Sequence, residues 1–391
     1  MVKLRILILM STILVVGAIA AVAILFARGF RLEKKQDNGA LQISAKGLLV
    51  VNSEPTGAQV FIDDTLQTAT NNTITLDPGS HTVSVRKEGF VEWHKNLNIQ
   101  KEIVNQVNAY LIPSAPSLTA LSFSGVINPQ VSPDFTKIVY AVPVSKDETK
   151  GGLWMYETTN LPLGFGRDPQ RITNADLSSF TWEWSPDARN ILVASKSATY
   201  LLPVASYTES KQLVNVSAQV TKIKTDWDTS KQEKTTAQLA KLDLEVRKVF
   251  QTSTKDITFS PDETKILYTA TASATIPSGI VKELPGSSSQ AQQRTLKAKN
   301  IYIYDIKEDR NFLIEDTGNP VYWVQNSLNV VIPDKQKIVV ADYDGTNKVT
   351  VYSGNYIFPY AFPTTSTSKM VILTSFGATG TLPNLYWLSL K

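Results

Sequence analysis

Residue types that carry out chemistry are scarce in this chain of 391 residues. It has no cysteine, which excludes disulfides, thiolate metal sites, a cysteine nucleophile and a lipid anchor on cysteine. Its two histidines are His81 and His94. A zinc site needs at least three protein ligands, and neither histidine has another close to it in the sequence. We expect His81 to be structural, and His94, which follows Trp93, does not suffice for a metal site.

One acidic stretch has some of the ligands of a calcium loop. It reads Asp342-x-Asp344-Gly345-x-Asn347. A complete loop has a third Asp or Asn before the glycine and a glutamate near position twelve, and both are missing here. A hairpin turn is therefore the preferred interpretation. The sequence predicts no metal site and no cofactor.

Two tryptophans form another candidate site. Trp182 and Trp184 flank Glu183, so on a strand the two indoles lie on one face. Such a pair either belongs to a hydrophobic core or offers a surface on which a glycan stacks. We prefer the core and keep glycan binding as the alternative.

No catalytic motif is present in the sequence. G-x-S-x-G, a phosphate-binding Walker loop and a dinucleotide fingerprint are all missing. The net charge is only +4, and no run of Lys and Arg is interleaved with aromatic residues, so nucleic acid is not an expected partner. We predict a binding protein that is not an enzyme. The alternative is a hydrolase that uses carboxylates on a glycan or a peptide.

A phrase that occurs three times predicts the fold. Each copy stands at the same distance before an apolar strand, and the copies are Ser132-Pro133-Asp134, Ser185-Pro186-Asp187 and Ser260-Pro261-Asp262. Proline ends the preceding strand, and the Ser and Asp side chains bond to the backbone of the turn. We predict that the three prolines occupy equivalent positions in successive units.

This phrase resembles the inter-strand turn of the TolB-like β-propeller repeat, in which a glycine follows the aspartate. Phe135, Ala188 and Glu263 replace that glycine, so we expect a somewhat different turn. Two degenerate copies of the phrase precede the strands at 328–331 and 369–373. The resemblance implies an all-β fold over 118–391, with five blades and six as the alternative.

The widest gap between copies holds a predicted helical insertion at about 221–256. Ser230-x-x-Glu233 has the pattern of a capping box, which marks a helix start. An apolar stripe follows at helical spacing, formed by Leu239, Leu242, Val246, Val249 and Phe250. We expect this stripe to pack on the propeller; the alternative is a docking element for a partner.

We predict that the insertion forms a rim with a second loop, at 277–299, whose part at 284–299 is of low complexity and expected to be mobile. Charged residues are expected on the outer face of the helix: Lys231, Glu233, Lys234, Lys241 and Asp243. The predicted partner at this rim is a protein or a cell-envelope polymer. The sequence does not predict an oligomeric state.

The stretch at 47–113 alternates short apolar runs with turn residues, which indicates a small β-sandwich. It resembles a PEGA domain, found mostly in surface and exported prokaryotic proteins, and this implies a binding or spacer role. Thr56 and Asp64 depart from the family pattern. The matching residues are Ser53, Pro55, Gly57, Ala58, Val60, Ile62, Asp63, Pro78, Gly79, His81, Lys87, Gly89 and Phe90.

The uncharged apolar run at 6–27 predicts a transmembrane helix, since it suffices for a hydrocarbon core of about 30 Å. A cleaved signal peptide is the alternative, although its apolar core is usually shorter. Residues 1–5 form a tail and 28–46 a linker. The flanking charges favour a cytoplasmic C-terminal side. The size of the following domains and the resemblances favour export, so we predict a single-pass membrane protein with extracytoplasmic domains.

Overall fold

The structure of the chain is a computed structural model that describes residues 2–27, 30–34, 41–144, 150–159, 167–280, 282, 284–376 and 381–391. Its contacts divide the chain into two compact units. Unit 1 comprises Met1–Leu111 and Lys282–Ala291, and unit 2 comprises Ile112–Val281 and Gln292–Lys391. The chain therefore leaves unit 2 once, contributes a short segment to unit 1, and returns.

The prediction of a transmembrane anchor at 6–27, and with it the single-pass membrane localisation, is wrong. Among the residues that the structure describes, no helix is long and apolar enough to cross a membrane. The apolar run lies in helix α1 (Val2–Ala27).

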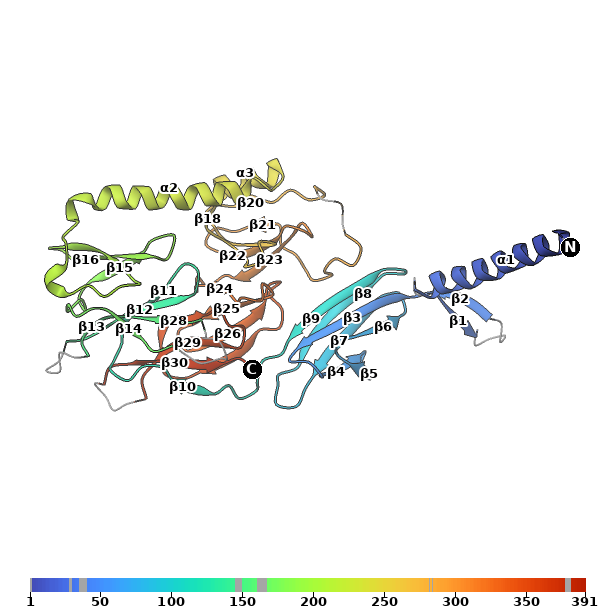
Figure 1. Ribbon diagram of the computed structural model, residues 1–391, viewed down its shortest axis with the longest axis horizontal. Helices are drawn as coiled ribbons and strands as arrows, with labels where there is room; N and C mark the ends of the chain where they lie inside the picture. Colours follow the sequence, from blue (N-terminus) through green and yellow to red (C-terminus); the bar gives the residue numbers. More distant parts are fainter. Residues whose placement is uncertain are drawn as a thin grey trace. The chain divides into compact units, whose positions relative to one another are not determined.

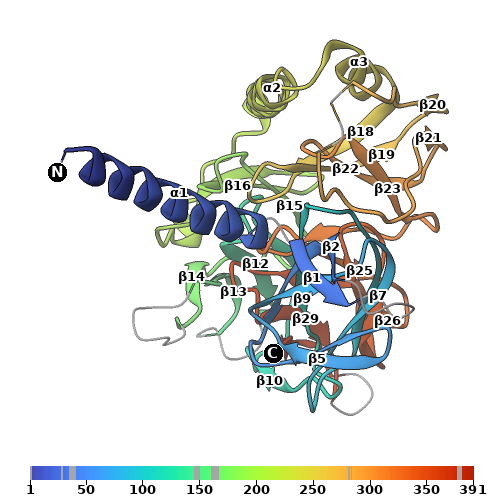
Figure 2. The ribbon, with the colours of Figure 1, turned by 90° about the vertical axis from the view of Figure 1, so that its right-hand side faces the viewer.

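Unit 1 contains two sheets that enclose one core (Figures 1 and 2). One sheet has the order β6-β3-β9, in which β3 and β9 are parallel, and the other has the order β5-β4-β7-β8. The strands are β3 (Gly47–Glu54), β4 (Gln59–Ile62), β5 (Thr65–Ala69), β6 (Asn72–Leu76), β7 (Gly79–Arg86), β8 (Trp93–Ile99) and β9 (Val104–Tyr110). A two-stranded sheet, β1 (Phe30–Lys34) with β2 (Leu41–Ala45), precedes them.

The core of unit 1 follows from alternation along its strands. Every second residue of β3 is buried, and Val83 and Val85 of β7 are fully buried, as a strand with one face on a core requires. Trp93 and Ile99 of β8 close the same core. The expected β-sandwich is therefore present.

Unit 2 contains five antiparallel sheets of three or four strands, which follow one another along the described chain except that the last also includes β10. We number them one to five. They are β11-β12-β13-β14, β15-β16-β17, β18-β19-β22-β23, β24-β25-β26-β27 and β10-β30-β29-β28. A separate hairpin, β20-β21, belongs to the region of sheet three.

The strands of unit 2 are short and joined mostly by turns. Their bounds are β10 (Leu118–Ala120), β11 (Ile127–Val131), β12 (Lys137–Val142), β13 (Gly152–Glu157), β14 (Gln170–Thr173), β15 (Thr181–Trp184), β16 (Asn190–Ala194), β17 (Thr199–Pro203), β18 (Thr254–Phe259), β19 (Lys265–Ala270), β20 (Ala274–Thr275), β21 (Thr295–Leu296), β22 (Ile301–Asp305), β23 (Arg310–Glu315), β24 (Tyr322–Trp323), β25 (Asn329–Pro333), β26 (Lys337–Asp342), β27 (Val349–Ser353), β28 (Tyr356–Pro363), β29 (Lys369–Thr374) and β30 (Asn384–Ser389).

Pro133, Pro186 and Pro261 occupy equivalent positions, which confirms the prediction. Each lies in the turn between the first and second strands of sheets one, two and three. In sheet four, β26 stands between β25 and β27, so β27 is the fourth strand.

Packing between neighbouring sheets forms separate hydrophobic clusters. One cluster joins sheets one and two, and another joins sheets three and four. A further cluster joins sheet one to sheet five, with Tyr140 and Tyr156 on one side and Phe362 and Leu385 on the other. Sheet five also contains β10, from the beginning of unit 2, paired with β30 from its end. The first and last parts of unit 2 are therefore held together.

Two helices separate sheets two and three: α2 (Val220–Leu239) and α3 (Leu244–Ser253). In Figures 1 and 2, α2 lies outside the sheets, near β16 and β18. Helix α2 begins ten residues before Ser230, so the expected capping box lies in its interior. No proline or glycine interrupts α2, so local propensity allows the helix to continue through that position. The actual side-chain cap is Asp243 of α3, which accepts a hydrogen bond from the Glu245 amide.

Candidate functional site

A cavity of about 1620 Å³ in unit 2 is the candidate site. Its walls come from the first strands and adjoining turns of sheets one to four and from β19 of sheet three, and α2 contributes one side. The aromatic residues in the wall are Phe135, Trp184, Phe259, Tyr268, Tyr322 and Trp323. The charged residues are Asp134, Glu183, Asp187, Lys231, Lys234, Lys255, Asp256, Glu263 and Lys299.

The Ser-Pro-Asp turns that border the cavity have one internal hydrogen-bond pattern. In the third copy, the Ser260 hydroxyl donates to Asp262 Oδ1 at 2.6 Å and accepts from the Lys265 amide at 2.9 Å. The other copies repeat both bonds at 2.5 and 2.9 Å around Ser132, and at 2.6 and 2.9 Å around Ser185. The serine thus connects the aspartate of the turn to the strand that follows. Both hydrogen bonds of the serine hydroxyl are to residues at most five positions further along the chain.

The fourth residue of each turn is left-handed although it is not glycine. Phe135, Ala188 and Glu263 have φ of 58°, 56° and 57°, and Ser327 in the degenerate fourth copy has φ of 58°. The four turns therefore share one backbone conformation at this position. The hydrogen bonds of the turn hold these residues in a conformation that costs about 1–2 kcal/mol without glycine.

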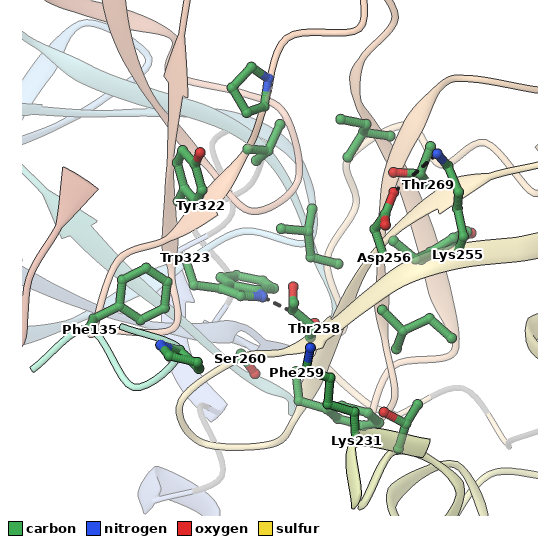
Figure 3. Close-up of a pocket in the computed structure, with 18 of the residues that line it drawn as sticks. Phe135, Lys231, Lys255, Asp256, Thr258, Phe259, Ser260, Thr269, Tyr322 and Trp323 are labelled. Atoms are coloured by element: carbon green, nitrogen blue, oxygen red, sulfur yellow. Dashed lines mark hydrogen bonds and ion pairs between the residues drawn. The ribbon is translucent and has the colours of Figure 1, made fainter. Parts of the chain in front are cut away.

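Tryptophans connect neighbouring sheets at this level. The indole of Trp184 donates to the Gln130 carbonyl of sheet one at 3.4 Å, and the indole of Trp323 donates to the Thr258 carbonyl of sheet three at 3.3 Å. Figure 3 shows the second bond at the cavity wall. Trp182 and Trp184 are 4% and 6% exposed and lie in the core between sheets one and two. The preferred interpretation as core residues is confirmed.

The first strands of sheets one and three each have a bulge, and the two bulges lie at the same distance before the Ser-Pro-Asp turn. One carries an amide side chain and the other a carboxylate. Asn128 and Asp256 have φ of 47° and 53°, at shifts in the pairing of β11 and β18. Each stands four residues before the serine of its turn, and a bulge re-aims the side chain that it carries. Figure 3 shows Asp256 and Lys255 beside Thr269. The sequence analysis did not predict these bulges. An Asn or Asp four residues before the serine of the turn could have indicated them, because these residues are enriched at positive φ.

The carboxylates of the turns are held in their ionised form. Partial burial by itself raises the pKa of Asp262, but hydrogen bonds from Ser260 and Thr264 outweigh it, so the pKa is lowered. The same balance lowers the pKa of Asp134. The Ser185 hydroxyl is the main cause of the lowered pKa of Asp187.

Helix α2 contacts the cavity wall through polar side chains. Lys224 and Lys231 lie 3.1 and 3.5 Å from the Glu183 carboxylate of β15. Gln238 and Lys241 bond to Glu263 at 3.0 and 2.9 Å. Lys231 and Lys234 therefore face the cavity, and Lys241 contacts a turn. Lys231 and Lys234 line the cavity and so do not lie on an outer face as expected, whereas the side chain of Lys241 is 67% exposed.

The apolar stripe of the insertion packs on sheet three, as expected. Leu239, Leu242, Val246 and Phe250 are buried with Tyr268 and Tyr302 in one cluster. The Phe250 ring lies 4.7 Å from that of Tyr268. The stripe is therefore part of the core and not a docking element.

Residues 282–291 of the expected second loop belong to unit 1, whereas the helical insertion belongs to unit 2. The rest of that loop returns to sheet three, where β21 pairs with β20 and Arg294 reaches Asp309 at 2.7 Å.

The other sequence candidates are structural. His81 on β7 bonds to Asp63 Oδ2 at 2.7 Å and to the Asp77 carbonyl at 2.9 Å. Asp342 and Asp344 lie in the hairpin between β26 and β27, as preferred, and accept hydrogen bonds from neighbouring side chains. In the described part of the chain, no cluster of three metal-binding side chains occurs.

Comparison with known proteins identifies the first unit. Residues 46–114 match the PEGA domain family, which confirms that resemblance. No curated protein matches the chain.

Solved structures that match include TolB proteins, in line with the resemblance of the repeated turn. Putative TolB from Agrobacterium tumefaciens is 12% identical, with 66% of this chain and 76% of that chain covered and a TM-score of 0.23. TolB from Acinetobacter baumannii is 11% identical, with 88% of this chain and 64% of that chain covered and a TM-score of 0.21. At these TM-scores the likeness supports no inference about the site.

Proposed function

We propose that unit 2 is a five-bladed β-propeller whose central opening is the cavity. Five successive sheets, the β10–β30 pairing and the cluster joining sheets one and five support a closed ring. The first strand of each of four sheets contributes to one cavity, as the innermost strands of a propeller do.

On this architecture, the protein is a binding protein of the cell envelope that holds a protein segment or an envelope polymer at the cavity. The observation that carries this proposal is the size and lining of the cavity. Small-molecule pockets measure about 300–1000 Å³, and this one exceeds that range. Aromatic rings and lysines at its edge suit a long ligand with apolar and polar groups. The PEGA domain supports the envelope assignment, since its family is found mostly in surface and exported proteins.

Binding without turnover is favoured over hydrolysis by the state of the carboxylates. An efficient general acid or base has a pKa near the working pH. The pKa values of Asp134 and Asp187 are shifted the other way, and their oxygens accept hydrogen bonds within the turns. Glu183 and Glu263 are paired with lysines of the helical insertion.

A photo-crosslinking experiment tests the site. Cells producing the full chain carry a photoreactive phenylalanine analogue at Phe135, at the cavity, or at Phe123, which is 84% exposed and outside it. We expect a discrete crosslinked product only from position 135. Equal products from both positions would refute the cavity as the binding site.

Charge reversal on α2 then tests the wall that the helix supplies. Lys231→Glu with Lys234→Glu is expected to lower the crosslinking yield about tenfold, and Lys222→Glu, on the same helix but outside the cavity wall, leaves the yield unchanged. Point substitutions are preferable to deleting the insertion, since a deletion would remove Phe250 from the core. Release of fragments from envelope glycans or peptides by the purified protein, lost in Asp256→Asn, would support the hydrolase instead.

A further inference from the structure

The two sheets of unit 1 end in strands that follow one another in the chain. β8 is the last strand of the sheet β5-β4-β7-β8, and β9 is the last strand of β6-β3-β9. Edge strands present unpaired backbone groups, on which another extended chain can add. Alternate residues of an antiparallel strand direct these groups to opposite sides. On β8, the outward groups include the Asn96 carbonyl and the Asn98 amide.

Residues 284–291, here termed the strap, lie on this edge. The Ser289 hydroxyl donates to the Asn96 carbonyl at 3.0 Å and accepts from the Asn98 amide at 3.3 Å. The Gln290 side-chain amide donates to the same Asn96 carbonyl at 2.7 Å. These bonds join strap side chains to strand backbone, and none of them is a backbone pair of a β-ladder.

Gly286 lets the strap approach β9 closely. Its φ is +78°, and a Cβ at this position would lie 2.8 Å from the Val104 carbonyl oxygen and 3.5 Å from Asn105 Nδ2. Asn105 is 5% exposed, and its Oδ1 atom is buried without a hydrogen-bond partner. The strap thus fits the edge sterically but leaves a buried acceptor unsatisfied, which costs about 1–3 kcal/mol.

We propose that the β8 edge of unit 1 is a strand-addition site for an extended polypeptide, and that the strap covers it until such a partner displaces it. An added strand pairs its own amides and carbonyls with the outward groups of β8, where the strap offers only side chains. It also brings amide donors next to β9, where Asn105 lacks one. Binding by main-chain pairing is a recurring mode of peptide recognition.

Hydrogen exchange of the full chain tests the cover. Gly286→Ala clashes with the Val104 carbonyl and opens the strap, whereas Gly279→Ala pays a similar left-handed cost at φ of +75° with nothing within 4 Å. We expect the Asn98 amide to exchange at least tenfold faster in Gly286→Ala and in the Ser289→Ala, Gln290→Ala pair, and unchanged in Gly279→Ala. Equal exchange of this amide in all variants would refute the strap as a cover.

A labelled peptide of eight alternating threonines and valines tests strand addition. Fluorescence anisotropy is expected to show at least tenfold tighter binding to the opened variants than to the wild type and Gly279→Ala, because the site is no longer occupied. If the Asn98 amide is exposed but the peptide binds all variants equally, or none, strand addition is refuted. Neither readout involves the cavity of unit 2, so failure here leaves the proposed function standing.

Discussion

Replacing the serine of one repeated turn is expected to destabilise unit 2 by about 2–4 kcal/mol. Ser260 is 2% exposed, and Ser260→Ala removes a hydrogen bond to the ionised Asp262 carboxylate and the acceptor of the buried Lys265 amide. A hydrogen bond to a charged group contributes about 1.5–3 kcal/mol, and a buried donor left unpaired costs about 1–3 kcal/mol. The two effects overlap, which gives the range stated.

The repeat supplies internal replicates of this experiment. Ser132 and Ser185 are 1% and 2% exposed and make both bonds at nearly identical distances. The three Ser→Ala variants are therefore expected to agree within about 1 kcal/mol. Ser178→Ala is the matched control, because Ser178 donates to Asp176 at the same 2.6 Å but in an exposed pair. It is expected to change stability by less than about 0.5 kcal/mol.

Urea unfolding followed by tryptophan fluorescence measures the effect. With a slope near 3 kcal/mol per molar urea, the midpoint for unit 2 falls by about 1 M in each turn variant. The loss should also depend on pH. The lowered pKa of Asp262 contributes stability above its unfolded value, and this is lost as the pH falls through the folded pKa. The variant and the wild type therefore converge in acid. A drop no larger than that of Ser178→Ala would refute the reasoning.

Three further perturbations have defined outcomes in urea unfolding. Asp309→Asn is expected to cost about 3–5 kcal/mol, because it leaves the guanidinium of Arg294, whose side chain is 12% exposed, without its carboxylate. Phe250→Ala, at a side chain 1% exposed, is expected to cost about 3–5 kcal/mol and to loosen α3. Burial lowers the pKa of His81, but hydrogen bonds to Asp63 and the Asp77 carbonyl outweigh it and raise the pKa above 6.5. Unit 1 should therefore lose stability as the pH rises through the raised pKa of His81, and His81→Asn should remove that dependence.

Matched substitutions control these three. Asp316→Asn changes an exposed carboxylate near sheet three, and Leu244→Ala truncates a side chain of α3 that is 56% exposed; both should be almost neutral. His94→Asn changes the other histidine of the chain and should preserve the pH dependence of unit 1. If a control is as destabilising as its partner, or if His94→Asn removes the pH dependence, the corresponding argument fails.

Three features could not be predicted from the sequence: the start of α2, the position of its lysines at the cavity, and the attachment of the strap to β8. The capping pattern Ser230-x-x-Glu233 is a local signal, but the helix starts at Val220 and continues through it. Lys231 and Lys234 look like solvent-facing charges in the sequence, and only the path of α2 beside Glu183 and Glu263 brings them to the cavity. The low-complexity segment has no apolar pattern that would predict a packed position. Its polar side chains attach it to β8 instead.

The sequence by itself determined the features whose bonds are local. The Ser-Pro-Asp turns form within five residues, and the alternation of β3 and β7 follows from one buried face, so the repeated strands and the PEGA domain were predictable. Tertiary structure alone decided what depends on residues far apart. The strap reaches Asn96 from 193 positions away, and β10 pairs with β30 at the other end of unit 2. A one-dimensional pattern does not record which distant backbone groups need a partner, and those groups decide both contacts.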